Sequence, residues 1–152
     1  MTPDEEFMQH ALKLAKDAMA IGEVPVGAVV VREGVIVGEG CNRPISSVDP
    51  TSHAEIMALR DAATRIGNYR LNDCTLYVTL EPCMMCAGAI FHARISRLVY
   101  GAKDPKTGVC GSVMDVFADP RLNHHAAVTS GVLEESCANI LRHFFSERRM
   151  KS

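Results

Sequence analysis

The sequence has no large excess of charge of either sign: 16 Lys and Arg stand against 18 Asp and Glu, a formal net charge of −2. Nucleic-acid-binding proteins usually have a strongly basic surface, so any contact with RNA must come from a local patch. Taken alone, this charge favours a small-molecule substrate. No apolar run is long enough to span a membrane, and the acidic residues 1–6 contain no signal-peptide core.

A second C-x-x-C pair is also absent, and no H-x3–5-H pattern is present to complete a four-ligand zinc cage. Six cysteines in a chain without a leader indicate a reducing compartment, and we therefore expect a cytoplasmic protein. Four of these cysteines lie in apolar surroundings and are interpreted as small core residues rather than disulfide partners: Cys41, Cys74, Cys110 and Cys137.

What the chain does contain is H-x-E at His53 and Glu55, followed by P-C-x-x-C ending in Cys83 and Cys86. One imidazole and two thiolates are three zinc ligands, the number that leaves a fourth position for water at a catalytic site. Glu55 is a suitable proton carrier for that water. Cys83 and Cys86 are three residues apart, so on a helix they share one face. A helix start also favours the thiolate that binds metal.

His53 and Glu55, two residues apart, would not share a face inside a helix. They can converge only beyond a helix N-terminus, towards which side chains lean. The pattern therefore predicts two helix N-termini that face one metal. Each element has a simpler interpretation: Ser52-x-x-Glu55 fits a capping box, and C-x-x-C alone fits a redox pair or half of a structural zinc site. The combination favours the catalytic metal site.

Alternating helical and strand patterns predict an α/β fold with helices on both faces of the sheet. The junction of a strand with a helix is where such sheets place ligands, and the P-C-x-x-C motif lies at one. The expected elements are a capped helix from Thr2 to Gly22, a hairpin (24–31 and 35–37), a helix (53–67), a strand (75–80), a helix (83–92), strands at 95–102 and 126–132, and a helix from Glu134.

Outside the motif, several residues have both a binding and a structural interpretation. Asn42 could contact the edge of a base or form a turn, and Lys106, in a turn-rich segment, could contact substrate or be solvated. The pair at 124–125 (His-His) is interpreted as surface loop. Basic residues near the end of the last helix could complement its dipole or bind phosphates, with Phe144 or Phe145 as a stacking surface: Arg142, Arg148, Arg149 and Lys151.

The motif and its flanks resemble the bacterial tRNA-specific adenosine deaminases, within the cytidine and deoxycytidylate deaminase superfamily. The resemblance covers nearly the whole chain. Asn68-Tyr69-Arg70-Leu71 and the Lys-Thr-Gly loop make this family a better match than the superfamily in general. Ser52, where many relatives have alanine, is a mild departure. The matching segments are 22–29, 42–44, 49–56, 68–71, 79–89 and 101–108.

This resemblance implies a single zinc-dependent deaminase domain over residues 1–152, built as a three-layer α/β/α sandwich around a five-stranded mixed sheet. The implied reaction converts the wobble adenosine of a tRNA anticodon, in particular an arginine tRNA, to inosine and releases ammonia. The family is usually a homodimer that draws RNA contacts from both subunits. The alternatives are a free nucleobase or nucleoside deaminase with the same zinc core, and a non-catalytic RNA-binding module with structural zinc.

Residue by residue, the resemblance implies that one zinc ion per subunit is held by His53, Cys83 and Cys86. Glu55 would carry protons. Asn42 matches a base-contacting residue, and Phe145 and the basic end of the last helix, with Arg149, fall where the family approaches the anticodon loop. Lys106, from its turn-rich segment, is added to these as a candidate substrate contact.

Overall fold

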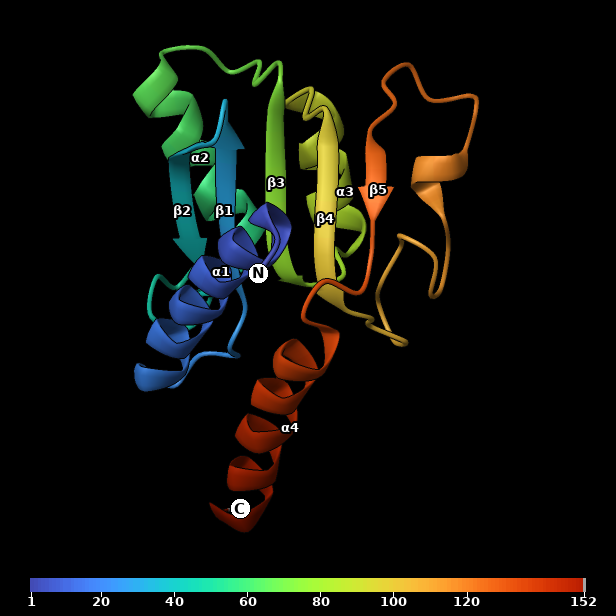
Figure 1. The fold of residues 1–152 in the computed structure, drawn as a ribbon. Helices are drawn as coiled ribbons and strands as arrows, with labels where there is room; N and C mark the ends of the chain where they lie inside the picture. Colours follow the sequence, from blue (N-terminus) through green and yellow to red (C-terminus); the bar gives the residue numbers. More distant parts are fainter. Residues whose placement is uncertain (152) are drawn as a thin grey trace.

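The structure, a computed structural model, describes residues 1–151, and the side chain of Lys151 lies outside this description. Helices and strands alternate along most of the chain, except that β1 and β2 follow each other directly as a hairpin (Figure 1). The elements are α1 (Pro3–Ala20), β1 (Gly27–Arg32), β2 (Val35–Cys41), α2 (Ala54–Ile66), β3 (Cys74–Leu80), α3 (Met84–His92), β4 (Arg97–Ala102), the 3-10 helix η1 (Val116–Ala118), β5 (Ala127–Thr129) and α4 (Glu134–Lys151).

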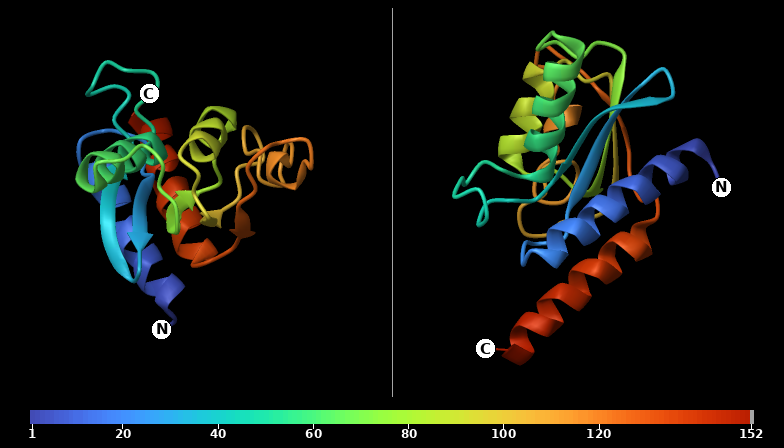
Figure 2. Two further views of the ribbon diagram at one scale, coloured as in Figure 1. Left: turned by 90° about the horizontal axis from the view of Figure 1, so that it is seen from above. Right: turned by 90° about the vertical axis from the view of Figure 1, so that its left-hand side faces the viewer.

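The strands form one mixed sheet in the order β2-β1-β3-β4-β5. β1 is antiparallel to both β2 and β3, whereas β3, β4 and β5 run parallel. α2 and α3 cover one face of the sheet, and α1 and α4 lie on the other (Figure 2). The predicted three-layer α/β/α sandwich with a five-stranded mixed sheet is therefore confirmed.

The hydrophobic core is divided by the sheet into two clusters. Leu76 and Ile90 belong to the cluster beneath α2 and α3, while Tyr77 and Met8 belong to the cluster beneath α1. Successive residues of a strand point to opposite faces, which is why neighbours in β3 enter different clusters. Burial on both faces explains why the central strands β1, β3 and β4 are largely apolar.

The six cysteines are free, as predicted. Cys74, Cys110 and Cys137 are buried in the two apolar clusters, whereas Cys41, at the end of β2, is half-exposed. The interpretation as small core residues is confirmed for the three buried ones, because they pack among apolar side chains.

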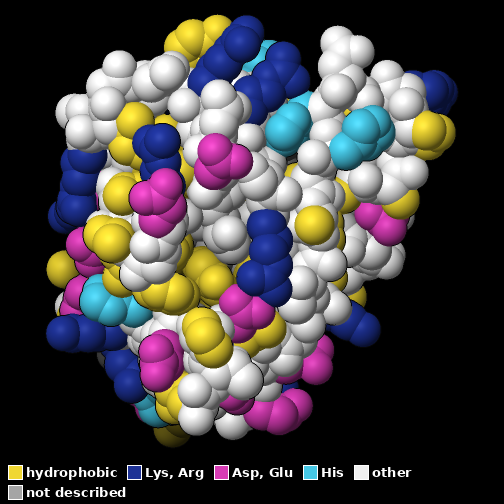
Figure 3. Space-filling view, turned by 45° about the horizontal axis from the view of Figure 1, so that its top comes forward, with side chains coloured by type: hydrophobic (Ala, Val, Ile, Leu, Met, Phe, Trp, Pro, Cys, Tyr) yellow, Lys and Arg dark blue, Asp and Glu magenta, His cyan; other side chains and the backbone are white. Residues whose placement is uncertain are grey.

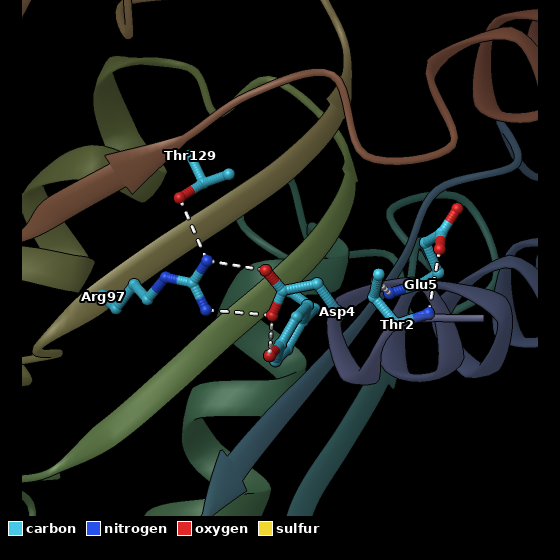
Figure 4. Close-up of polar contacts among 6 residues, drawn as sticks. Thr2, Asp4, Glu5, Arg97 and Thr129 are labelled. Carbon is cyan, nitrogen blue, oxygen red and sulfur yellow. Dashed lines mark hydrogen bonds and ion pairs between the residues drawn. The ribbon is translucent and has the colours of Figure 1, made fainter.

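The start of α1 is fixed to β3 and β4 by polar contacts (Figure 4). Thr2 and Glu5 form the predicted capping box. Asp4 accepts two hydrogen bonds from Arg97, at 2.9 and 2.6 Å, and one from the hydroxyl of Tyr77 at 2.7 Å. The guanidinium of Arg97 holds the pKa of Asp4 below its usual range. Burial, reinforced by the bond to Asp4, raises the pKa of Tyr77 to about 12.

The second strand of the hairpin is longer than expected. We predicted that it ends at Val37, but β2 continues to Cys41 and includes Gly38 and Gly40. A Cβ atom at Gly40 would lie 2.5 Å from the carbonyl oxygen of Ala54, and one at Gly38 would lie 2.6 Å from that of Ala58. We expected glycines here to allow a bulge or a close approach of the backbone. They allow a close approach of β2 to the backbone of α2, and both lie inside the strand rather than after it.

The segment after β4 is largely irregular, and its last strand is shorter than predicted. β5 covers only Ala127–Thr129. His124 bonds the carbonyl oxygen of Ile95 at 2.7 Å through Nε2, and His125 is exposed. These histidines do not join the metal-ligand cluster described below, which agrees with their interpretation as loop residues. No helix in the part of the chain that the structure describes has the length and apolar character needed to cross a membrane.

Candidate active site

Two helix starts meet at the edge of the sheet where β3 and β4 end, the lower edge in Figure 1. His53 is the N-cap of α2, and Cys83 is the N-cap of α3, with Cys86 in the first turn of that helix. The backbone of both cap residues is extended, so their side chains project beyond the helix ends. The prediction that two helix N-termini face one site is confirmed.

The three donor atoms are arranged as a zinc ion requires. The Nδ1 atom of His53 lies 3.7 Å from the Sγ of Cys83 and 3.6 Å from the Sγ of Cys86. All three atoms lie within 4.8 Å of one another. Tetrahedral zinc with its usual bond lengths separates a nitrogen and a sulfur ligand by about 3.5 Å. The two sulfurs are not joined to each other, and together with His53 they form a candidate metal-ligand cluster, which favours the metal-site interpretation of this C-x-x-C over the redox pair.

The protonation of the cluster already favours metal binding. The hydrogen bond from the Cys86 thiol, helped by one from His53, lowers the pKa of Cys83 to about 4. The pKa of Cys86 is raised, because its thiol donates to Cys83 and lies in a buried site near Glu55. One sulfur is thus a thiolate without metal, and the positive charge of a bound ion would release the second proton.

Glu55 lies in the first turn of α2 and is only 4% exposed. Burial raises its pKa to about 7, with the nearby sulfur of Cys83 acting in the same direction and His53 opposing it. The capping-box interpretation of Ser52 and Glu55 is wrong, because His53 is the N-cap and the hydroxyl of Ser52 donates to Asp49 at 2.9 Å. A carboxyl group with a pKa near neutrality is suited to take up and release protons.

Residues 1–102 match the profile of the family described as the cytidine and deoxycytidylate deaminase zinc-binding region. The chain belongs to this family. It is 58% identical over 147 residues to the tRNA-specific adenosine deaminase of Haemophilus influenzae, covering 96% of this chain and 85% of that protein. It is 46% identical over 151 residues to the tRNA-specific adenosine deaminase of Bacillus subtilis, covering 99% and 94%.

A solved structure from a study of A-to-I editing by tRNA:A34 deaminases at the wobble position of transfer RNA has the same fold. It superposes with a TM-score of 0.86 at 46% identity and covers 90% of this chain and 99% of that chain. The deaminase family therefore accounts for the fold and for the zinc-ligand cluster together.

Asn42, the residue after β2, faces the start of α2. Its Oδ1 atom accepts a hydrogen bond from the N–H of Ala54 at 2.9 Å. The side-chain oxygen thus satisfies one of the N–H groups that a helix start leaves unpaired. The amide NH2 group of Asn42 takes no part in this bond, so it can still donate to a hydrogen-bond acceptor of a ligand.

Lys106, Phe145 and Arg149 line one groove between the end of α1, α4 and the segment after β4. The groove is a local basic patch, although the net charge of the whole chain is −2. Five basic side chains and one acidic side chain line it: Lys16, Lys106, Arg142, Arg148 and Arg149, with Glu147. Elsewhere charges of both signs intermingle, as on the face in Figure 3. His53, Cys83 and Cys86 are not among the residues that line the groove.

The structure separates the two candidate stacking residues of α4. Phe144 is buried and lies under the guanidinium of Arg148, 4.8 Å from its ring centroid. Phe145 is 43% exposed, so it is the ring that can face a ligand. Arg148 also donates to the carbonyl oxygen of Gly22 at 2.8 Å, which ties α4 to the end of α1.

Sequence reasoning missed two buried carboxylates that flank the site, Glu23 and Glu81, each 2% exposed. Glu23 accepts hydrogen bonds from the N–H groups of Ile45 at 3.3 Å and Ser46 at 2.6 Å. Burial opposes the ionisation of Glu23, but these bonds outweigh it and hold its pKa below the usual range. The only signal in the sequence was an acidic residue at the edge of an apolar strand, which is too common to be diagnostic.

Proposed function

We propose that this protein is a zinc-dependent tRNA adenosine deaminase that converts the wobble adenosine of an anticodon to inosine and releases ammonia. The observation that carries the reaction type is the buried Glu55 beside the cluster of His53, Cys83 and Cys86. The substrate class is supported by the two relatives named as tRNA-specific adenosine deaminases, which match almost the entire chain.

Each part of the site has a chemical role in this reaction. His53, Cys83 and Cys86 would hold the zinc ion, which when bound supplies an activated water as the nucleophile. Glu55 accepts a proton from the water and delivers it to the ring nitrogen next to the carbon under attack. Glu55 then takes the proton of the hydroxyl group that has been added to that carbon and passes it to the amine, which leaves as ammonia while the carbonyl group of inosine forms. The burial of Glu55, which raises the pKa of its carboxyl group, favours proton uptake as well as release.

The substrate contacts we propose are those of Asn42 at the base and of Lys106, Phe145 and Arg149 at the flanking nucleotides. Basic side chains neutralise phosphates, and an exposed aromatic ring stacks on an unpaired base. All three outer residues line the basic groove, which supports a shared function. An anticodon loop suits such a site because its bases are splayed out at lower cost than paired bases.

We further propose a homodimer and an arginine tRNA as the substrate, in a single cytoplasmic domain over residues 1–152. Exposed apolar side chains support a partner surface near the site, since exposed apolar patches commonly mark interaction sites. Met84 and Met85 are 58% and 36% exposed in the first turn of α3, and Val113 and Met114 are 54% and 49% exposed.

The activity is tested with zinc-loaded protein and an anticodon stem-loop that carries a wobble adenosine. We expect inosine from the RNA and no ammonia from free nucleobases; the reverse result would select the free-base deaminase. Glu55→Gln and Glu55→Ala should retain zinc and lose turnover, because neither side chain can carry a proton. Turnover that persists in both variants would contradict the role of Glu55.

Asn42→Asp tests the contact with the base. The carboxylate can still accept the hydrogen bond from Ala54, so the start of α2 is preserved, but it offers no donor to the substrate. We expect kcat/KM to fall by about tenfold to a hundredfold, the range for a lost hydrogen bond to a buried polar partner. Unchanged kinetics would show that Asn42 serves only α2.

A further inference from the structure

Glu81 lies between the end of β3 and the zinc-ligand residue Cys83, and it is 2% exposed. A buried carboxylate is costly unless its oxygens are hydrogen-bonded. It does not belong to the cluster of three donors that can hold a metal. Glu81 thus lies two residues before a zinc-ligand residue but is not itself a ligand, so its burial must serve another role.

All of the hydrogen bonds that Glu81 accepts come from one segment, residues 104–112. Oε1 accepts from the N–H of Asp104 at 3.0 Å and from the hydroxyl of Ser112. Oε2 accepts from the N–H of Cys110 at 2.9 Å and from that of Ser112 at 3.1 Å. These four bonds use the full acceptor capacity of an ionised carboxylate.

The backbone at Glu81 and Pro82 is bonded both to this segment and to the end of β4. The N–H of Val109 donates to the carbonyl oxygen of Pro82 at 3.0 Å, and the N–H of Glu81 donates to that of Ala102 at 2.8 Å. Gly108 lies directly against the carboxyl group, where a Cβ atom would overlap it. Residues 104–112 are therefore folded around this one side chain.

Lys106 is carried by this segment into the basic groove. Asp104 accepts hydrogen bonds from the N–H groups of Lys106 at 3.0 Å and Thr107 at 3.2 Å, which forms the turn that presents the lysine. Glu81 bonds Asp104 before Lys106 and Cys110 after it. Glu81 therefore sets the position of Lys106 relative to Cys83.

We propose that Glu81 is a positioning residue for the RNA substrate: it holds residues 104–112 against the zinc-ligand segment so that Lys106 stays within the groove. This role presupposes the RNA substrate proposed above. Glu81 itself contacts no substrate, and its effect passes through the backbone of the segment. Displacements of about 1 Å in groups that position a substrate can cost about a hundredfold in rate.

Glu81→Gln is the sharpest variant, because it keeps the shape but replaces one acceptor oxygen with an NH2 group that faces two donors. We expect one zinc per subunit, faster hydrogen exchange in residues 104–112, and an increase of about tenfold in KM and Kd for the stem-loop. Gly108→Ala should reproduce this result with the carboxylate intact, since the added methyl group displaces the segment from Glu81.

A double-mutant cycle separates positioning from a general loss of structure. In a Lys106→Ala background, Glu81→Gln should add little to the loss of affinity, because coupled residues have non-additive effects. Asp119→Asn is the matched control: Asp119 also accepts a main-chain N–H, from Arg121 at 2.9 Å, but in a turn outside the site. Its Kd for the stem-loop should equal that of the wild type.

Three results would overturn the role of Glu81: an unchanged Kd with only a lower melting temperature, full additivity with Lys106→Ala, or loss of zinc from Glu81→Gln. If the wild type binds the stem-loop but produces no inosine, the proposed activity fails instead. The Kd values and the exchange rates would still decide whether Glu81 positions the segment.

Discussion

The close backbone packing of β2 against α2 makes Gly40→Ala a demanding test of the structure. A Cβ atom at position 40 would lie 2.5 Å from the carbonyl oxygen of Ala54 and the nitrogen of Ala58, and 2.7 Å from the Cβ of Met57. Two of these atoms are backbone, so no change of rotamer can relieve the overlap. The helix must move away from the strand.

The cost can be estimated from the effects of overpacking, which typically destabilise a core by about 1–3 kcal/mol per added group. A rigid backbone on both sides places Gly40→Ala towards the upper end, at about 2–3 kcal/mol. In a chain of this length, each kcal/mol lowers the melting temperature by about 2–4 °C. The movement also displaces His53 and Glu55, because both belong to the start of α2.

We therefore expect Gly40→Ala to melt about 4–12 °C lower, the product of those two ranges, and to lose at least about tenfold in kcat on an anticodon stem-loop. The assays are thermal and urea unfolding, zinc content and inosine formation. Val35→Ala is the control from the same strand, because its side chain is 60% exposed and should change stability by less than about 0.5 kcal/mol. Wild-type stability and kcat in Gly40→Ala would refute the packing of β2 on α2.

Three further predictions concern stability. Asp4→Asn should destabilise the protein at neutral pH. Because the folded pKa of Asp4 is lowered, its contribution is complete above the unfolded pKa of about 4 and is lost as the pH falls through the folded value, so variant and wild type should converge in acid unfolding curves. Zinc removal by a chelator should lower the melting temperature of the wild type, whereas Cys86→Ser should show no such shift if the ligand set is correct. Glu23→Gln should cost about 1–3 kcal/mol in urea unfolding, because one of the N–H groups of Ile45 and Ser46 loses a buried acceptor; an unchanged midpoint would contradict this.

The zinc-ligand cluster could be predicted because its geometry follows from local rules. Cys83 and Cys86 are one helical turn apart, and a histidine two residues before a glutamate can converge with it only at a helix start. Both statements concern residues close together in the sequence. The structure confirms them: His53 and Cys83 are the N-caps of α2 and α3.

The residues that arrange the surrounding loops could not be predicted, because their partners are distant in the sequence. Glu81 bonds residues 23–31 positions later, and Glu23 bonds residues 22 and 23 positions later. No periodic pattern or motif relates such positions. The same limit explains the wrong end predicted for β2. Glycines such as Gly38 and Gly40 usually mark the end of a strand, and only the packing of α2 against them, through residues distant in the sequence, accounts for their place inside β2.

Taken together, the contacts indicate that the site is assembled in two independent ways. Zinc would join only the starts of α2 and α3, through His53 and the two cysteines. The flanking segments are held instead by buried polar side chains that accept main-chain N–H groups: Asn42 at α2, Glu23 at residues 45–46, and Glu81 at residues 104–112. Since these bonds need no metal, the flanking segments should keep their arrangement in the zinc-free protein. RNA affinity should therefore survive chelation better than turnover does.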